Sequence, residues 1–245
     1  MKATALLLMM AATLCFAGID DFYSFNATTT TYTPITGTQI GTILSDDALS
    51  EAINLGFSFP YGENSYSSVM VSSNGWVGLG TGFSHSNLSN TLNSTDWRPV
   101  LAPLWDDTSL AAGDCQYLLS GTAPNRVFTI QYMNLKWNYW ADNQFNIQVR
   151  IYETGKADFV YGPSTGDPAN TSASIGINMN PGGVNWFYSV TPGAAASASM
   201  TAENNNVGSW PGQGVVYEFL PTPPATNDLA CFRTARCRPD RKSVV

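Results

Sequence analysis

Hydrophobic and polar residues alternate with a period of two along most of the chain, the pattern of strands in a half-buried sheet. In the segment FNIQVRIYE, for example, Ile147, Val149 and Ile151 share one face, and the polar residues between them share the other. Clusters of Gly, Asn, Ser and Pro separate such segments, and apolar residues at helical spacing are nearly absent. The pattern predicts an all-β chain.

Turn residues between these segments predict how the strands pair. ETGK, in which Gly155 can take a positive φ, joins FNIQVRIYE to ADFVYG as a hairpin. In the same way GTAPNR joins CQYLLS to RVFTIQYMNLKW, and NPGG joins SASIGINM to NWFYSV. The dipeptide Asn74-Gly75 lies between YSSVMVSS and WVGLG and is a strong tight-turn signal. These connections predict an antiparallel meander.

About a dozen predicted strands are most economically packed as two sheets, because an antiparallel sheet can bury one face and expose the other. We therefore predict an antiparallel two-sheet β-sandwich, jelly-roll-like, with a closed β-barrel as the alternative. The sandwich module is expected over residues 18–220. The polar segment TGFSHSNLSNTLNSTDWRP is expected to be a long surface loop of the kind that can carry binding.

The two ends of the chain differ from this module in composition. Residues 1–17 combine one positive charge with an apolar run shorter than the ~20 residues that span a bilayer, which indicates a secretory signal peptide. No second long apolar segment follows. We therefore expect no membrane span, and a secreted or cell-surface location.

A Pro-rich linker, PTPPATND, is expected over residues 221–228. The last 17 residues, 229–245, hold five of the 11 basic residues and two of the four cysteines, and have no strand pattern. This change in composition suggests a truncated or frameshifted end, so that the natural polypeptide would continue into further β domains. A genuine basic tail that binds an acidic surface is the alternative.

Charge and cysteine content exclude some classes of protein. Residues 18–228 carry five basic side chains against 17 acidic ones, and such a surface repels nucleic acid. Removal of the signal peptide would leave Cys115, Cys231 and Cys237, an odd number that cannot form a complete disulfide framework. One disulfide could form, but the spacing does not indicate which two cysteines would pair.

Catalytic arrangements have little support in the sequence. The one histidine, His85, lies in the polar loop, whereas a Ser-His-Asp or Cys-His site needs a histidine held beside a nucleophile. Asp106 and Asp107 are adjacent, so in a strand they would point to opposite faces and could not flank a glycosidic bond. A glycosidase would need a distant partner such as Asp142 or Glu153. We expect a protein without enzymatic activity.

The same pair of aspartates is a candidate cation site. The segment DDTSLAAGD offers Asp106, Asp107 and Asp114 in one loop, and calcium prefers such oxygen ligands. The segment lacks the regular spacing of a calcium loop. The favoured interpretation is architectural: the aspartates accept backbone N–H groups and end the strand VLAPLW.

Aromatic residues form a second candidate site. The segment LKWNYWADN contains Trp137, Tyr139 and Trp140, which could stack on sugar rings, with Asp142 supplying hydrogen bonds. The alternative is core packing, which is the more frequent fate of tryptophan in a sandwich. Exposure of Trp137 and Trp140 would discriminate between the two.

The order of five motifs resembles the nidogen-type (NIDO-like) extracellular module. The motifs are FPYGENSYSSVMVSSNGWVGLG, LAPLWDD, RVFTIQYMNLKW, FNIQVRIYETGKADFVYG and ASIGIN, and the resemblance covers roughly residues 22–220. The chain is also similar to β-sandwich modules near the N-termini of large secreted bacterial surface proteins. The resemblance implies a structural or adhesion module that contacts an extracellular protein or a glycan, and it brings no enzymatic residues. A carbohydrate-binding module is the alternative, and a glycan-degrading enzyme the third reading.

Overall fold

The computed structural model describes residues 18–166, 168, 171–180 and 185–222. The predicted signal peptide, the basic tail and residues 223–228 of the predicted linker lie outside this part of the chain, as do Cys231 and Cys237. Within it the chain forms fifteen strands and two 3-10 helices, η1 (Ile19–Asp21) and η2 (Gly41–Ile43). None of these described elements is a helix of the length and apolarity that a membrane span requires.

The strands form two antiparallel sheets. An eight-stranded sheet contains, in spatial order, β1 (Tyr23–Thr29), β15 (Val215–Pro221), β11 (Ala157–Thr165), β10 (Gln144–Tyr152), β9 (Val127–Trp137), β8 (Asp114–Ser120) and β2 (Thr38–Gln39), and β7 (Thr108–Ser109) also pairs with β9. A seven-stranded sheet contains β14 (Ser197–Ser199), β13 (Phe187–Thr191), β12 (Ser174–Asn178), β6 (Val100–Trp105), β5 (Trp76–Leu79), β4 (Asn64–Ser72) and β3 (Ile53–Tyr61).

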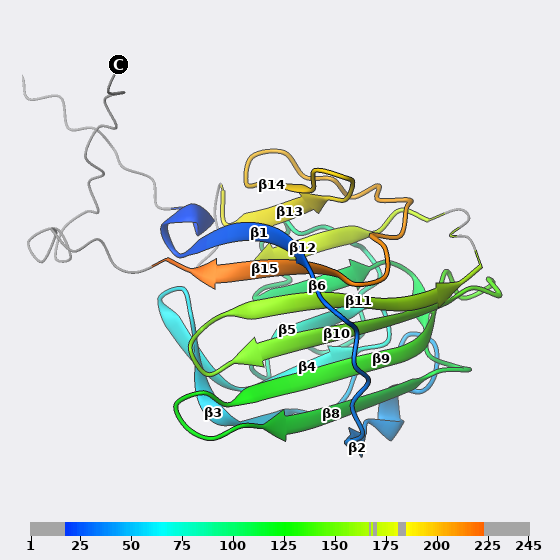
Figure 1. Ribbon diagram of the computed structural model, residues 1–245, viewed down its shortest axis with the longest axis horizontal. Coiled ribbons are helices and arrows are strands. Elements are labelled where there is room, and N and C mark those ends of the chain that lie inside the picture. The colour runs from blue at the N-terminus through cyan, green and yellow to red at the C-terminus, as the bar shows by residue number, and fades with distance from the viewer. Residues whose placement is uncertain (1–17, 167, 169–170, 181–184, 223–245) are drawn as a thin grey trace, which may run out of the picture. The chain divides into compact units, whose positions relative to one another are not determined.

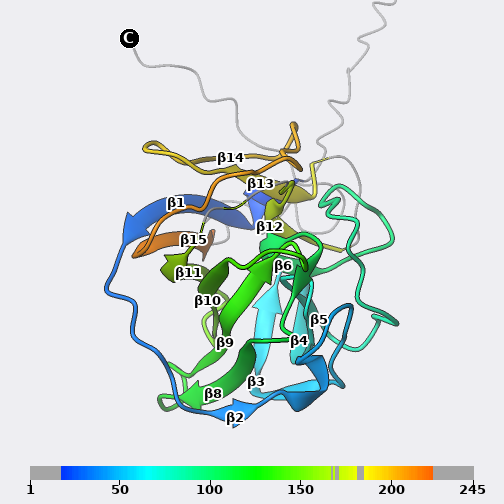
Figure 2. The same cartoon turned by 90° about the vertical axis from the view of Figure 1, so that its right-hand side faces the viewer.

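The two sheets pack face to face, which confirms the predicted β-sandwich (Figure 1). Seen from the side, β8–β11 form one layer and β3–β6 the other (Figure 2). No pairing among the described strands joins the two sheets, so the alternative of a closed barrel is wrong. The last strand, β15, ends at Pro221, one residue beyond the predicted end of the module.

The predicted meanders are confirmed. Strands β8, β9, β10 and β11 are neighbours in the order in which they follow each other along the chain, and β3, β4, β5 and β6 form a second such series. The hairpin between β10 and β11 closes at the Ile151–Ala157 pair, and Gly155 in its turn has a φ of 94°. A residue with a side chain would be strained in this conformation.

The predicted Asn74-Gly75 turn lies between β4 and β5. Gly75 has a φ of 72°, and a Cβ atom at this position would lie 1.9 Å from the carbonyl oxygen of Leu104 in β6. Backbone conformation and the close approach of a neighbouring strand therefore both require glycine here.

Tyrosine hydroxyl groups connect the two sheets through the core. Tyr132 of β9 donates to the carbonyl oxygen of Trp76 at 3.1 Å, and Tyr161 of β11 donates to that of Pro103 at 2.8 Å. Both side chains are fully buried, and burial raises the pKa of each well above its usual value. The hydroxyl groups stay protonated and satisfy carbonyl oxygens inside an otherwise apolar interior.

A strap of residues 30–37 crosses the outer face of the eight-stranded sheet between β1 and β2 (Figure 1). Gln131 of β9 accepts a hydrogen bond from the Ile35 amide at 2.9 Å, and Gln148 of β10 donates to the Thr33 carbonyl oxygen at 2.7 Å. The strap covers these two glutamines, which are fully buried although they lie on the polar face that the alternation predicted.

The polar loop of residues 81–99 packs on the outer face of the seven-stranded sheet, on the side away from the eight-stranded sheet (Figure 2). Its Phe83 and Leu92 join a buried cluster with Trp76 and Trp105. The indole N–H groups of both tryptophans donate to the carbonyl oxygen of Asn87, at 2.9 and 2.7 Å. The loop has no strands, as expected, but it encloses a small hydrophobic core.

Candidate functional site

The first aspartate of the LWDD motif, Asp106, accepts hydrogen bonds from three different parts of the chain. One oxygen of Asp106, Oδ2, accepts hydrogen bonds from the Trp137 indole N–H at 2.9 Å and from the Ser172 amide at 2.8 Å. The other, Oδ1, accepts from the Asp107 amide at 2.9 Å. Asp106 follows the last residue of β6, so its carboxylate ties the end of this strand to β9 and to the 171–172 segment. This geometry agrees with the architectural interpretation of the residue.

The second aspartate lies in a group of carboxylates. An isolated pair joins Asp46 to Ser109, and β7 follows Asp107 directly, so the 45–47 segment runs beside the LWDD turn. Partial burial and then the charges of Asp46, Asp47 and Asp106 raise the pKa of Asp107. Partial burial and the charge of Asp47 likewise raise the pKa of Asp46. Sequence reasoning missed Asp46 and Asp47, because their contacts are far apart in the chain.

The third candidate metal ligand, Asp114, has other partners. Its Oδ1 accepts a hydrogen bond from Gln39 at 2.8 Å and its Oδ2 accepts one from Gln116 at 2.7 Å, at the start of β8. Among the described residues no three Asp, Glu, His or Cys side chains are arranged to hold one metal ion. Calcium binding through Asp106, Asp107 and Asp114 stays a prediction.

The aromatic candidates divide into a buried and an exposed part. Trp137 is fully buried and packs edge-to-face on Phe145, with ring centroids 5.5 Å apart. It therefore cannot offer a face to a sugar, and its inclusion in a binding platform was wrong. Trp140 is 77% exposed and Tyr139 is 37% exposed, and their ring centroids are 4.2 Å apart.

The turn at 138–141 presents these two rings. Asn138 has a φ of 72°, its carbonyl oxygen accepts from the Ala141 amide at 2.9 Å, and its side chain accepts from the Trp140 amide. Below the turn, Asn143 is buried and bonds both the N–H and the carbonyl oxygen of Trp137. Asp142, the fourth predicted ligand-binding residue, is exposed beside the turn.

Strand pairing brings the two candidate sites to one end of the sandwich. Thr108 pairs with Trp137, and Ser109 pairs with Lys136. Asp107 therefore lies one residue before the Thr108–Trp137 pair in the β7 chain. On the β9 side, Tyr139 and Trp140 follow this pair by two and three residues. We call the segments 45–47, 106–107 and 138–142 together the Trp140 end.

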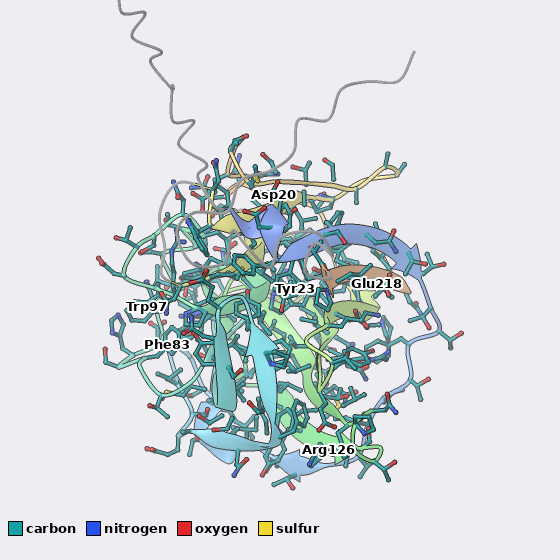
Figure 3. The ribbon with its side chains drawn as sticks, turned by 90° about the vertical axis from the view of Figure 1, so that its left-hand side faces the viewer. Asp20, Tyr23, Phe83, Trp97, Arg126 and Glu218 are labelled. Atoms are coloured by element: carbon teal, nitrogen blue, oxygen red, sulfur yellow. The ribbon has the colours of Figure 1, made fainter. Side chains whose placement is uncertain are left out.

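His85 lies in the 81–99 loop, where its ring contacts Trp97 at a centroid distance of 4.6 Å. Figure 3 shows Trp97 beside Phe83, and their ring centroids are 5.8 Å apart. The Nδ1 atom of His85 lies 3.2 Å from the Ser84 hydroxyl oxygen, and both side chains are exposed. This pair faces solvent and lacks the enclosed pocket in which a base activates a serine.

Comparison with known proteins places the whole sandwich in one family. No curated protein and no solved structure matches this chain. The family described as NIDO related matches residues 22–221, from the residue before β1 to the end of β15. This range contains both sheets, the strap and the Trp140 end. The chain therefore belongs to the NIDO-related family, in agreement with the resemblance carried by its motifs.

Proposed function

We propose that this protein is an extracellular, non-catalytic adhesion module that binds its partner through the Trp140 end. The exposure of Trp140 carries the proposal. All seven tryptophans lie among the described residues, and of these only Trp140 is exposed. Exposing a tryptophan on a folded surface leaves a large apolar area in water, and such residues are enriched at binding contacts.

Family membership supports the extracellular location, because the family takes its name from an extracellular module. The position of the aromatic pair supports binding. Tyr139 and Trp140 lie on a turn at the end of the sandwich, where a partner can reach them without opening either sheet. The buried residues Trp137 and Asn143 flank the turn and are hydrogen-bonded to each other, so the turn that carries the two rings is anchored at both ends.

A binding assay with coated beads tests this function. Beads carrying the full chain are compared with beads carrying Trp140→Ala on a panel of purified extracellular proteins and neutral oligosaccharides. We expect at least one component to bind the unaltered chain and to lose most of its binding to Trp140→Ala.

The matched control is Leu88→Ala, which removes another exposed apolar side chain from a different loop. This variant should bind as the unaltered chain does. If nothing on the panel binds, or if Trp140→Ala binds equally well, then the proposal is wrong.

A further inference from the structure

The Trp140 end combines an exposed aromatic pair with an excess of carboxylates. Asp46, Asp47 and Asp107 lie close enough for their charges to affect one another. Asp142 is exposed on the same turn as Trp140. Strand pairing therefore brings the aromatic turn and these carboxylates to the same end of the sandwich.

Among the described residues, no ion pair neutralises these carboxylates. Lys136 is the basic residue brought nearest by strand pairing, since it pairs with Ser109, which in turn pairs with Asp46. However, none of the ion pairs among the described residues joins Lys136 to Asp46 or Asp107. The other four basic residues of the described chain have different surroundings, and Arg126 and Lys156, for example, form ion pairs with Glu153, Asp158 and Glu218.

We propose that the ligand of the Trp140 end is a lysine or arginine side chain on an extended segment of an extracellular protein. This inference rests on the proposed adhesion function and names the chemistry of its partner. The cationic group lies over the ring of Trp140, the aromatic side chain that attracts cations best, and faces Asp46, Asp47 and Asp107. Bound there, the cationic group of the partner offsets the negative charge of these carboxylates.

A neutral sugar would use the aromatic face but leave this charge excess unchanged. Hydroxyl groups of a sugar can donate to one or two carboxylates, yet they carry no charge to offset the repulsion among three. The carboxylates therefore favour a cationic partner over a neutral glycan. They also favour electrostatic steering of a basic segment toward the aromatic pair.

The experiment measures binding of the full chain to two hexapeptides that differ only in carrying arginine or glutamine at alternate positions. We expect the arginine peptide to bind more tightly than the glutamine peptide. Trp140→Ala should weaken binding of the arginine peptide by about 2- to 30-fold, the range expected for a cation over an aromatic ring. Asp46→Asn combined with Asp107→Asn should weaken it as well.

The matched control removes the same charge elsewhere. Glu51 and Asp96 are exposed and lie outside the Trp140 end, so Glu51→Gln combined with Asp96→Asn lowers the net negative charge equally. This control should retain most of the affinity. Equal losses in the two double variants would show general attraction to an acidic protein and would overturn the inference.

Neutral oligosaccharides distinguish failure of this inference from failure of the proposed function. If an oligosaccharide binds and Trp140→Ala abolishes its binding, while neither peptide binds, the adhesion site stands and the cationic ligand is wrong. If Trp140→Ala changes binding of neither peptide nor sugar, both proposals fail. The variants are expected to fold, because Trp140 is exposed and the two asparagines remove repulsion.

Discussion

At the scale of single residues, the adjacent aspartates of LWDD have opposite environments. Asp106 accepts three hydrogen bonds that hold a turn together, two of them from outside the turn. Asp107 shares its surroundings with other carboxylates and has a raised pKa. Two identical residues, one position apart, therefore differ in role because only the first points toward donors from β9 and the 171–172 segment.

This difference predicts unequal effects of mutation. Asp106→Ala should lower the free energy of unfolding by about 1.5–3 kcal/mol, because it removes a charged acceptor and leaves the buried indole N–H of Trp137 without a partner. Asp107→Ala is the matched control and should change stability little. Chemical denaturation of both variants measures the difference.

The same experiment in calcium and in chelator tests the predicted metal site. If Asp106 serves only as a hydrogen-bond acceptor within the protein, its substitution lowers the free energy of unfolding by the same amount in calcium and in chelator. A loss seen only in calcium would assign Asp106 to metal binding instead, because a cation bound by the folded state stabilises it by mass action.

At the scale of elements, the strap shows how a polar sheet face becomes buried. Gln131 and Gln148 lie on the outer face of the eight-stranded sheet, where alternation predicts exposure. The strap pairs its backbone with their amide groups, and the ring of Tyr32 packs against Gly162 of β11. Glutamine suits this position because it can donate and accept at once.

Gln131→Ala should therefore loosen the strap. We expect faster hydrogen exchange at the Ile35 amide, and a loss of about 1–3 kcal/mol for backbone groups left without their partner. Gln144→Ala, at an exposed position of β10, provides the control. Unchanged exchange at Ile35 in the Gln131 variant would contradict this account.

At the scale of the whole molecule, the described chain has apolar packing on both faces of its seven-stranded sheet. One face contributes to the core between the sheets, and the other is covered by the 81–99 loop through Phe83, Leu92 and Trp97. The loop is thus part of the stable structure despite its polar composition. We therefore expect the 81–99 loop to present a fixed surface to any partner that binds there.

Leu92→Ala tests this packing. Leu92 is fully buried, and truncation of a buried leucine costs about 2–5 kcal/mol. Leu88→Ala, four residues earlier in the same loop and 45% exposed, should cost less than about 0.5 kcal/mol. Similar thermal midpoints for both variants would show that the loop contributes no core.

The sequence by itself determined the all-β class, the meanders and the tight turn at Gly75. Each of these depends on neighbours along the chain: the two-residue period of a strand and the conformational freedom of glycine in a turn. Motif order also identified the family. These signals are local, so they can be read without knowing what lies opposite each strand.

Only the tertiary structure decided which candidate residues are exposed. Trp137 and Trp140 are three positions apart and equally apolar, yet one is fully buried and the other is 77% exposed. Asp46 and Asp107 meet because strand pairing joins segments about sixty residues apart. Burial depends on what covers a surface, and distant parts of the chain supply that cover.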